Sequence, residues 1–159
     1  MPGIDRELKS RFTSEQQKAM LNVLFTANWL RTHQVTRLKP YGISPQQYNI
    51  LRILRGALDP AHASESEGGR MKAQSVKERM IDRAPNATRL TDKLIAKGLV
   101  KRERCDDDRR VIYVRITPKG LELLARVDAQ SQGGFESLLD GLKESEAKAI
   151  NRILDAWRG

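Results

Sequence analysis

The segment of residues 74–116 restricts the fold more than any other part of the chain. Two helical patterns, at residues 74–80 and 85–97, are separated by the turn "IDRA", and two strand-like stretches, "LVKRER" and "VIYVRI", follow directly. Two short helices joined by a tight turn are typical of a helix-turn-helix, and two adjacent strand patterns are typical of a β-hairpin. The order predicts a helix-turn-helix with a hairpin beside its second helix.

Each of these elements has one apolar side. In the second helix the residues predicted to face the core are Ala87, Leu90, Leu94 and Ile95. Those left on its other faces are Asn86, Thr88, Arg89, Asp92 and Lys93. In the second strand the alternation places Ile112, Val114 and Ile116 on one face, so this face is predicted to be buried and to anchor the hairpin.

The flanking sequence predicts helices at both ends of the chain. Residues 14–34 have helical apolar spacing, and a second helix is predicted from Ser44, a suitable N-cap, to about residue 58. Residues 59–73 are poor in apolar side chains and are predicted to form a surface loop. A further helix is predicted from residue 117 or 118, and after Gly133 and Gly134 the chain ends in the helical pattern "ESEAKAINRILDAWR". We predict a mainly α chain with a small β-hairpin.

Positive charge is concentrated in one third of the chain. Lysine and arginine number 29 against 20 acidic residues, which gives a net charge of +9. Residues 70–120 hold 15 of the basic residues and 7 of the acidic ones, so they carry almost all of this excess. A single basic segment indicates one surface for a polyanion such as nucleic acid, with an acidic lipid surface as the lesser alternative.

The turn of the hairpin, "CDDDRR", is predicted to contact DNA. An arginine at a hairpin tip can enter the minor groove, where the potential is most negative, and Arg110 is the candidate. Asp108 is predicted to hold its guanidinium extended, and Arg109 to contact phosphate. The alternative is that the acids only form a solvated turn.

The two helices supply the other predicted DNA contacts. Arg89 either reads guanine or pairs with Asp92 on the helix surface. Thr88 and Asn86 are further candidates for base contacts, and Lys93 and Lys101 for phosphate. Gln74 and Ser75, in the first turn of the first helix, are predicted to present N–H groups to a phosphate.

The sequence resembles the MarR family of winged helix-turn-helix transcriptional regulators over nearly its whole length. The resemblance is most specific in "ATRLTDKLIAKGLVKRERCDDDRRVIYVRITPKG". The matching steps are Thr88-Arg89-Leu90, Asp92-Lys93-Leu94, Lys97-Gly98-Leu99-Val100, Asp108-x-Arg110 and Thr117-x-x-Gly120. The chain departs from the family where Pro85 and Asn86 replace the usual serine, and in a longer, more polar loop at residues 61–70.

The resemblance implies a single MarR-like chain of residues 1–159. Residues 1–43 and 121–159 would be dimerisation helices, and residues 44–120 the winged helix-turn-helix region. It implies a homodimer on a pseudo-palindromic double-stranded DNA operator, probing successive major grooves. It also implies release of DNA by a small, often aromatic, ligand, and therefore a repressor. Trp29, His33 and Tyr48 are candidate pocket residues for this ligand, with simple core packing as the alternative.

Other chemistry has little support in the sequence. Cys105 suggests redox sensing, but it lies in the predicted wing among acidic residues, which does not favour a reactive thiolate, and the single cysteine excludes an internal disulfide. His33 and His62 lack the spacing of a metal or catalytic site, and we expect no cofactor. No apolar run approaches the ~20 residues of a membrane span, and the N-terminus lacks a signal-peptide pattern, so we expect a cytoplasmic protein.

Two further functions are weighed against DNA regulation. One is a winged-helix module that binds protein or RNA without an operator, which the intact basic segment disfavours. The other is an enzyme, which is disfavoured because no phosphate loop or nucleophile–base pattern is present.

Overall fold

The structure is a computed structural model that describes residues 3–9, 11–62, 68–82, 86–130, 138 and 141–159. The chain forms two compact units, Met1–Arg37 and Leu38–Gly159, and each is described here by itself. Among the helices in the described ranges, none combines the length and the apolar character needed to cross a membrane.

The first unit is helical. It contains α1 (Ile4–Glu7) and most of α2 (Glu15–Leu38), which confirms and extends the helix predicted from residue 14. The hydroxyl of Ser14 accepts a hydrogen bond from the Gln17 amide at 3.1 Å, and the Lys18 ammonium pairs with Asp5 at 3.0 Å. Several apolar side chains of α2 remain exposed, including Leu24 at 60%.

The second unit begins with η1 (Lys39–Tyr41) and α3 (Pro45–Gly56), followed by η2 (Pro60–His62). Ser44 caps α3 as predicted, because its side chain accepts from the Gln47 amide while the Gln47 side chain accepts from the Ser44 amide. This reciprocal cap fixes where the central helix of the unit begins.

The predicted helix-turn-helix is formed by α4 (Ala73–Arg79) and α5 (Ala87–Ala96). Beyond the end of α5, Gly98 has a φ of +70°, which confirms its predicted position, since this backbone conformation favours glycine. The predicted place of Pro85 in the first turn lies outside the described residues, as do residues 63–67 of the predicted loop and the predicted break at Gly133 and Gly134.

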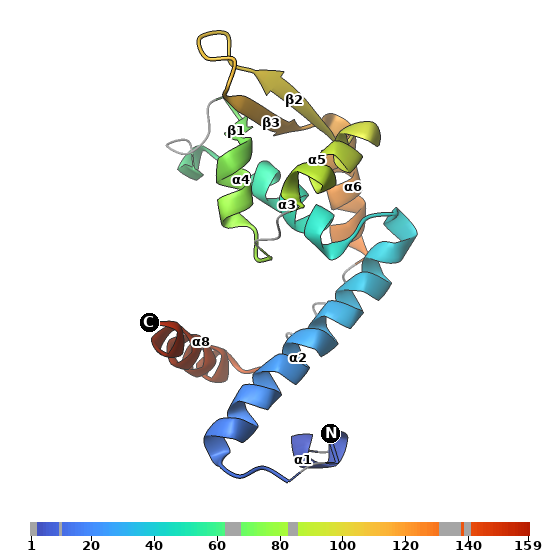
Figure 1. The fold of residues 1–159 in the computed structure, drawn as a ribbon. Coiled ribbons are helices and arrows are strands. Elements are labelled where there is room, and N and C mark those ends of the chain that lie inside the picture. Colours follow the sequence, from blue (N-terminus) through green and yellow to red (C-terminus); the bar gives the residue numbers. More distant parts are fainter. Residues whose placement is uncertain (1–2, 10, 63–67, 83–85, 131–137, 139–140) are drawn as a thin grey trace. The chain divides into compact units, whose positions relative to one another are not determined.

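The wing is a three-stranded antiparallel sheet and not a hairpin alone. Its order is β1 (Met71–Lys72), β3 (Ile112–Ile116), β2 (Val100–Arg104), with Met71 opposite Val114. The prediction of a loop throughout residues 59–73 is therefore wrong for Met71 and Lys72. A two-residue strand has no measurable alternation, and this one forms because β3 offers a free edge (Figure 1).

The predicted burial of β3 is correct only near its carboxyl end. Val114 and Ile116 are buried, whereas Ile112 is 38% exposed and does not anchor the hairpin as predicted. Tyr113, predicted to face away from the core, is 8% exposed because the Arg70 guanidinium lies 4.2 Å from its ring centroid. Alternation assigned the faces correctly, but burial depends on what covers each face.

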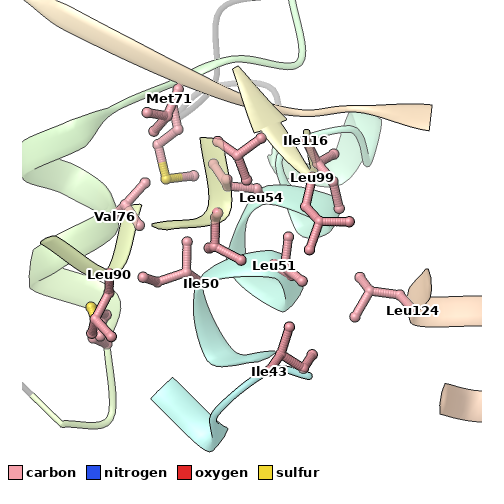
Figure 2. Packing of buried hydrophobic residues seen from close by; sticks show 14 of the residues in the cluster. Ile43, Ile50, Leu51, Leu54, Met71, Val76, Leu90, Leu99, Ile116 and Leu124 are labelled. Atoms are coloured by element: carbon pink, nitrogen blue, oxygen red, sulfur yellow. The ribbon is translucent and has the colours of Figure 1, made fainter. Parts of the chain in front are cut away.

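One hydrophobic core holds α4, α5 and the base of the wing together. The labelled side chains of α3 lie at its centre in Figure 2, between residues of α4 and α5 and residues of the sheet and α6. Ile50, Leu51 and Leu54 are completely buried. Burial of apolar area is the main favourable contribution to folding, so α3 acts as the support against which both α5 and the wing are fixed.

The carboxyl-terminal part contains α6 (Pro118–Ala129) and α8 (Glu144–Arg158). Thr117 caps α6 by accepting a hydrogen bond from the Gly120 amide at 3.1 Å, as its place before Pro118 predicts. The sequence predicts an apolar stripe on α8, formed by Ile150, Ile153, Leu154 and Trp157, and in the structure Ile153 and Trp157 are 54% and 56% exposed. The chain alone therefore leaves this stripe largely uncovered.

Candidate nucleic-acid interface

The apolar and the polar residues of helix α5 lie on different faces, as predicted. Ala87, Leu90 and Leu94 are buried in the core, and Ile95 is partly buried against it. The side chains on its exposed faces are Asn86, Thr88, Arg89, Asp92 and Lys93. The helix thus presents two cations and two hydrogen-bonding side chains to solvent.

Asp92 pairs with the wing and not with its own helix. An Arg102 guanidinium nitrogen lies 2.5 Å from the Asp92 carboxylate. The alternative in which Asp92 engages Arg89 is therefore not the arrangement seen, and the ion pair instead links α5 to β2. This leaves the acid neutralised beside the exposed face on which Arg89 and Lys93 lie. Arg102 was not singled out from the sequence.

The turn before α5 is attached to α3. The Ile81 amide donates to the Asn49 side chain at 2.9 Å, and Gln46 donates to Asp82 at 2.6 Å. In the first turn of α4, the Gln74 side chain donates to Glu78 at 2.9 Å. Ser75, the other residue predicted there, is partly buried. The turn is thereby held to the same core helix as α5.

The wing tip is a β-turn built on Asp108. The Val111 amide donates to the Asp108 carbonyl at 3.0 Å, so Arg109 and Arg110 occupy the two central positions of the turn. Below it, the Cys105 amide donates to the Val111 carbonyl at 3.2 Å. Both arginines are exposed on the loop that extends beyond β2 and β3 (Figure 1).

Asp108 contacts Arg110 through the backbone. Its carboxylate accepts a hydrogen bond from the Arg110 amide at 2.9 Å. The sequence-based prediction named the guanidinium, whereas this contact is an Asx-turn, the local motif that aspartate favours at the start of a turn. Asp108 therefore fixes the main chain from which Arg110 projects.

A polar cluster covers the face of the sheet opposite to the one on which Val114 and Ile116 meet the core. The Glu103 carboxylate lies 3.1 Å from Arg115 Nε, 3.4 Å from Arg70 and 3.8 Å from the Lys101 ammonium. Arg115 also donates to the Gly68 carbonyl at 2.7 Å. Burial alone would raise the pKa of Glu103, but the hydrogen bonds and charges of these cations outweigh it and lower the pKa below its usual value.

We call these residues the outer-face cluster (Arg70, Lys101, Glu103, Tyr113 and Arg115). Of its members only Lys101 was a candidate from the sequence, and the cluster itself was not predicted. Part of it was accessible from the hairpin register, because Lys101 lies opposite Arg115 and Glu103 opposite Tyr113. Arg70 was not, since it reaches the sheet through the unpredicted strand β1.

The predicted ligand residues are divided between the two units. In the first unit the rings of Trp29 and His33 meet edge to face at 4.6 Å. In the second unit the Tyr48 hydroxyl accepts a hydrogen bond from Arg52 at 3.2 Å. A cavity of about 170 Å³ lies elsewhere, lined by residues of α3, α4, α5 and the sheet that include Gln74, Thr88 and Arg102.

Metal and redox chemistry gain no support from the site. Within the described ranges, no three His, Cys, Asp or Glu side chains come together in a way that could hold a metal ion. Cys105, for which redox sensing had little support from the sequence, is a partly buried free thiol at the base of the wing turn.

Comparison with known proteins identifies the family. The model of the MarR family matches residues 66–112. The crystal structure of a MarR transcription factor from Planctomyces limnophilus is similar over 92% of this chain and 99% of that chain, with 31% identity and a TM-score of 0.64. The chain belongs to the MarR family. It is accordingly a DNA-binding transcriptional regulator with a winged-helix fold.

Two more distant similarities are to a curated regulator and to a solved structure of the same fold. The HTH-type transcriptional regulator MhqR of Bacillus subtilis is 22% identical over 125 residues, which is 79% of each chain. A cysteine-to-serine mutant of MarR from E. coli, solved in complex with operator DNA, is similar in fold with a TM-score of 0.73, at 19% identity and with 92% of this chain and 98% of that chain covered.

Proposed function

We propose that this MarR-family regulator is a homodimeric repressor that binds a pseudo-palindromic double-stranded DNA operator and is released by a small aromatic ligand. The observation that supports this is that one core joins α5, which carries Arg89 and Lys93, to the base of the wing, whose exposed tip carries Arg109 and Arg110. In such an arrangement the helix can bind in the major groove while the wing reaches the adjacent minor groove.

The proposed DNA contacts follow the exposure of the residues. Arg89 reads guanine, and Thr88 and Asn86 contact neighbouring bases, because all three lie exposed on or beside the first turn of α5. Arg110 enters the minor groove from a turn fixed by Asp108. The proposed phosphate contacts are Gln74, Ser75, Lys93, Lys101 and Arg109.

Dimerisation is proposed through residues 1–43 and 121–159, which flank the DNA-binding region of residues 44–120. Apolar side chains on both flanks are exposed in the single chain, among them Leu24 on α2 and Ile153 on α8. Exposed apolar surface of this kind marks interaction sites. A two-fold dimer would place two copies of α5 in successive major grooves about 34 Å apart.

The proposed ligand is a small aromatic molecule. Trp29 and His33 pair their rings in the first unit, and Tyr48 is partly exposed in the second. Aromatic side chains of this kind commonly line pockets for small aromatic ligands, so we propose a small aromatic acid as the ligand. The regulator would work in the cytoplasm and would sense this acid there. Among the relatives, the E. coli protein MprA is described as a transcriptional repressor, which supports the direction of regulation.

The test begins with selection of bound duplexes from a random pool. Affinity for the selected duplex is then measured at several salt concentrations for the wild type, for Arg89→Ala and Arg110→Ala, and for Arg6→Ala, a control that removes one exposed cation outside the basic segment. We expect log K to fall steeply with log salt, because several phosphates are neutralised. Arg89→Ala should relax base preference at one position, and Arg110→Ala should lower affinity.

Three results would contradict the proposal. A wild-type protein with no preference over random duplex would indicate an interaction module for protein or RNA. Unchanged affinity of Arg110→Ala would remove the minor-groove contact. Operator binding that persists with every member of a panel of small aromatic acids would remove the ligand.

A further inference from the structure

Apolar support decreases along the wing from its base to its far end. At the base Val100 and Ile116 are buried, whereas at the far end Arg104 and Ile112, which lie opposite each other, are both exposed. The outer-face cluster lies along this length, from the pair Lys101 and Arg115 next to the base to the pair Glu103 and Tyr113 nearer the far end. Its polar contacts therefore add to the support of the part of the wing that the core encloses least.

Glu103 is the centre of those polar contacts. Its two oxygens engage side chains from different segments: Oε1 accepts from Arg115 on β3 at 3.1 Å, and Oε2 from Arg70, just before β1, at 3.4 Å. One carboxylate on β2 thus joins all three strands. Hydrogen bonds between charged groups are stronger than neutral ones, and a carboxylate can serve two guanidinium groups at once.

The segment before β1 is held closely against this cluster. Arg115 Nη1 donates to the Gly68 carbonyl at 2.7 Å, and Arg70 stacks on Tyr113. At Gly69, whose φ is +78°, an added Cβ would lie 2.6 Å from a Leu58 side-chain atom. The backbone of residues 68–70 is therefore packed against its surroundings and gives Glu103 a firm base.

We propose that Glu103 is a positioning residue that fixes the direction of the wing, and hence of Arg110, for minor-groove binding. This inference rests on the proposed DNA-binding function. Glu103 acts through Arg115 and Arg70 and does not itself contact DNA. Loss of its contacts would let the far half of the wing sample many directions, and binding would then have to restrict them.

The direction in which DNA affinity changes when Glu103 is replaced distinguishes this positioning role from an effect of its charge alone. Glu103 is an acid within a basic, DNA-facing segment, so on charge alone its removal should strengthen DNA binding. Positioning predicts the opposite: weaker binding despite the added positive charge. An effect of the residue on folding alone would change the melting temperature but not the affinity of the folded protein.

The experiment compares Glu103→Gln and Arg115→Lys with a control, Asp59→Asn, on the duplex selected by the wild type. Asp59 is an exposed acid outside the cluster and outside the proposed dimerisation segments, so its replacement makes the same charge change and keeps the side-chain oxygen that accepts from the Ala61 amide. Arg115→Lys keeps the positive charge but loses the fork that holds Glu103 and Gly68 together. Affinities are measured by fluorescence anisotropy at fixed salt, with concentrations corrected for the folded fraction.

We expect Glu103→Gln to weaken binding roughly tenfold, the effect of losing one hydrogen bond to a charged group, and Arg115→Lys to weaken it in the same direction. Each is then combined with Arg110→Ala. Because Glu103 acts through Arg110, the combined loss should be smaller than the product of the single losses. Asp59→Asn should bind as the wild type does, or slightly more tightly.

The outcomes distinguish failure of the proposed DNA-binding function from failure of the positioning role of Glu103. If the wild type prefers no duplex, the proposed function fails and the role of Glu103 fails with it. If the wild type and Asp59→Asn bind the duplex, but Glu103→Gln binds as tightly or more tightly than the wild type, only the positioning role is refuted. Losses that multiply independently with that of Arg110→Ala would also refute it.

Discussion

Replacement of Gly120 by alanine should destabilise the protein, although alanine is normally the better helix former. Gly120 lies in the first turn of α6. A Cβ at this position would lie 2.4 Å from the Leu99 carbonyl oxygen and 2.7 Å from Ile116 Cγ1. The first distance is about 1 Å shorter than ordinary van der Waals contact, so an atom must move.

The Leu99 carbonyl cannot move without loosening the base of the wing. It accepts a hydrogen bond from the Thr117 amide at 3.0 Å, and Leu99 itself is buried immediately before β2. Overpacking of this kind typically destabilises by about 1–3 kcal/mol. The better helix propensity of alanine offsets roughly 1 kcal/mol of this. The net expectation is a loss of up to about 2 kcal/mol, which corresponds to roughly 4–8 °C in melting temperature for a chain of this size.

Thermal and urea denaturation of Gly120→Ala and Gly56→Ala measure this directly. Gly56, the last residue of α3, is a matched control because an added Cβ would meet no atom within 4 Å. Gly56→Ala should therefore stabilise by roughly 0.5–1 kcal/mol through the unfolded chain. If alanine stabilises at both positions, the close approach between α6 and the wing is not a real constraint, and the reasoning is refuted.

Three further predictions concern the cap, the apolar stripe and the acid of the outer-face cluster. Ser44→Ala should lower the free energy of unfolding by about 1 kcal/mol, because the Gln47 amide loses its acceptor, and urea denaturation against Ser145→Ala, which changes an exposed serine of α8, would show whether the loss is specific. Ile153→Asp should shift the proposed dimer towards monomer in sedimentation equilibrium without unfolding the chain, because Ile153 is half exposed in the single chain; an unchanged mass would exclude α8 from the interface. Because the folded pKa of Glu103 is lowered, its ionised form stabilises the protein above the ordinary carboxyl pKa of about 4.3. The stability difference between the wild type and Glu103→Gln should then disappear as the pH falls through the folded pKa, and a difference that grows on acidification would have the wrong sign.

The sequence predicted those elements whose pattern is complete within a few turns. The cap at Ser44, the apolar face of α5 and the left-handed Gly98 each depend on neighbours within four residues. Their local chemistry is therefore visible without the fold. For Asp108 the contact with Arg110 was predicted, but the atom was not: the carboxylate accepts from the Arg110 amide, as aspartate at the start of a turn favours, and not from its guanidinium.

The features that were missed depend on distant partners. Met71 and Lys72 form a strand only because β3 is present to pair with them, more than 40 positions later in the chain. Asp92 had a plausible partner one turn away in Arg89, yet it pairs with Arg102 on β2. Spacing along one helix cannot rank a local cation against one supplied by another element, because the ranking depends on how the two elements pack.

The exposure of Ile112 shows what this means for the candidate site. Alternation correctly placed it on the same face as Val114, but the core ends before it reaches the far half of the wing. An apolar pattern alone would have predicted a wing supported along its whole length. In the structure the support changes from apolar packing at Ile116 to charged contacts at Glu103, and the arginines at the tip depend on the second kind. The wing's response to salt and acid should therefore differ from that of the core, although both belong to one unit.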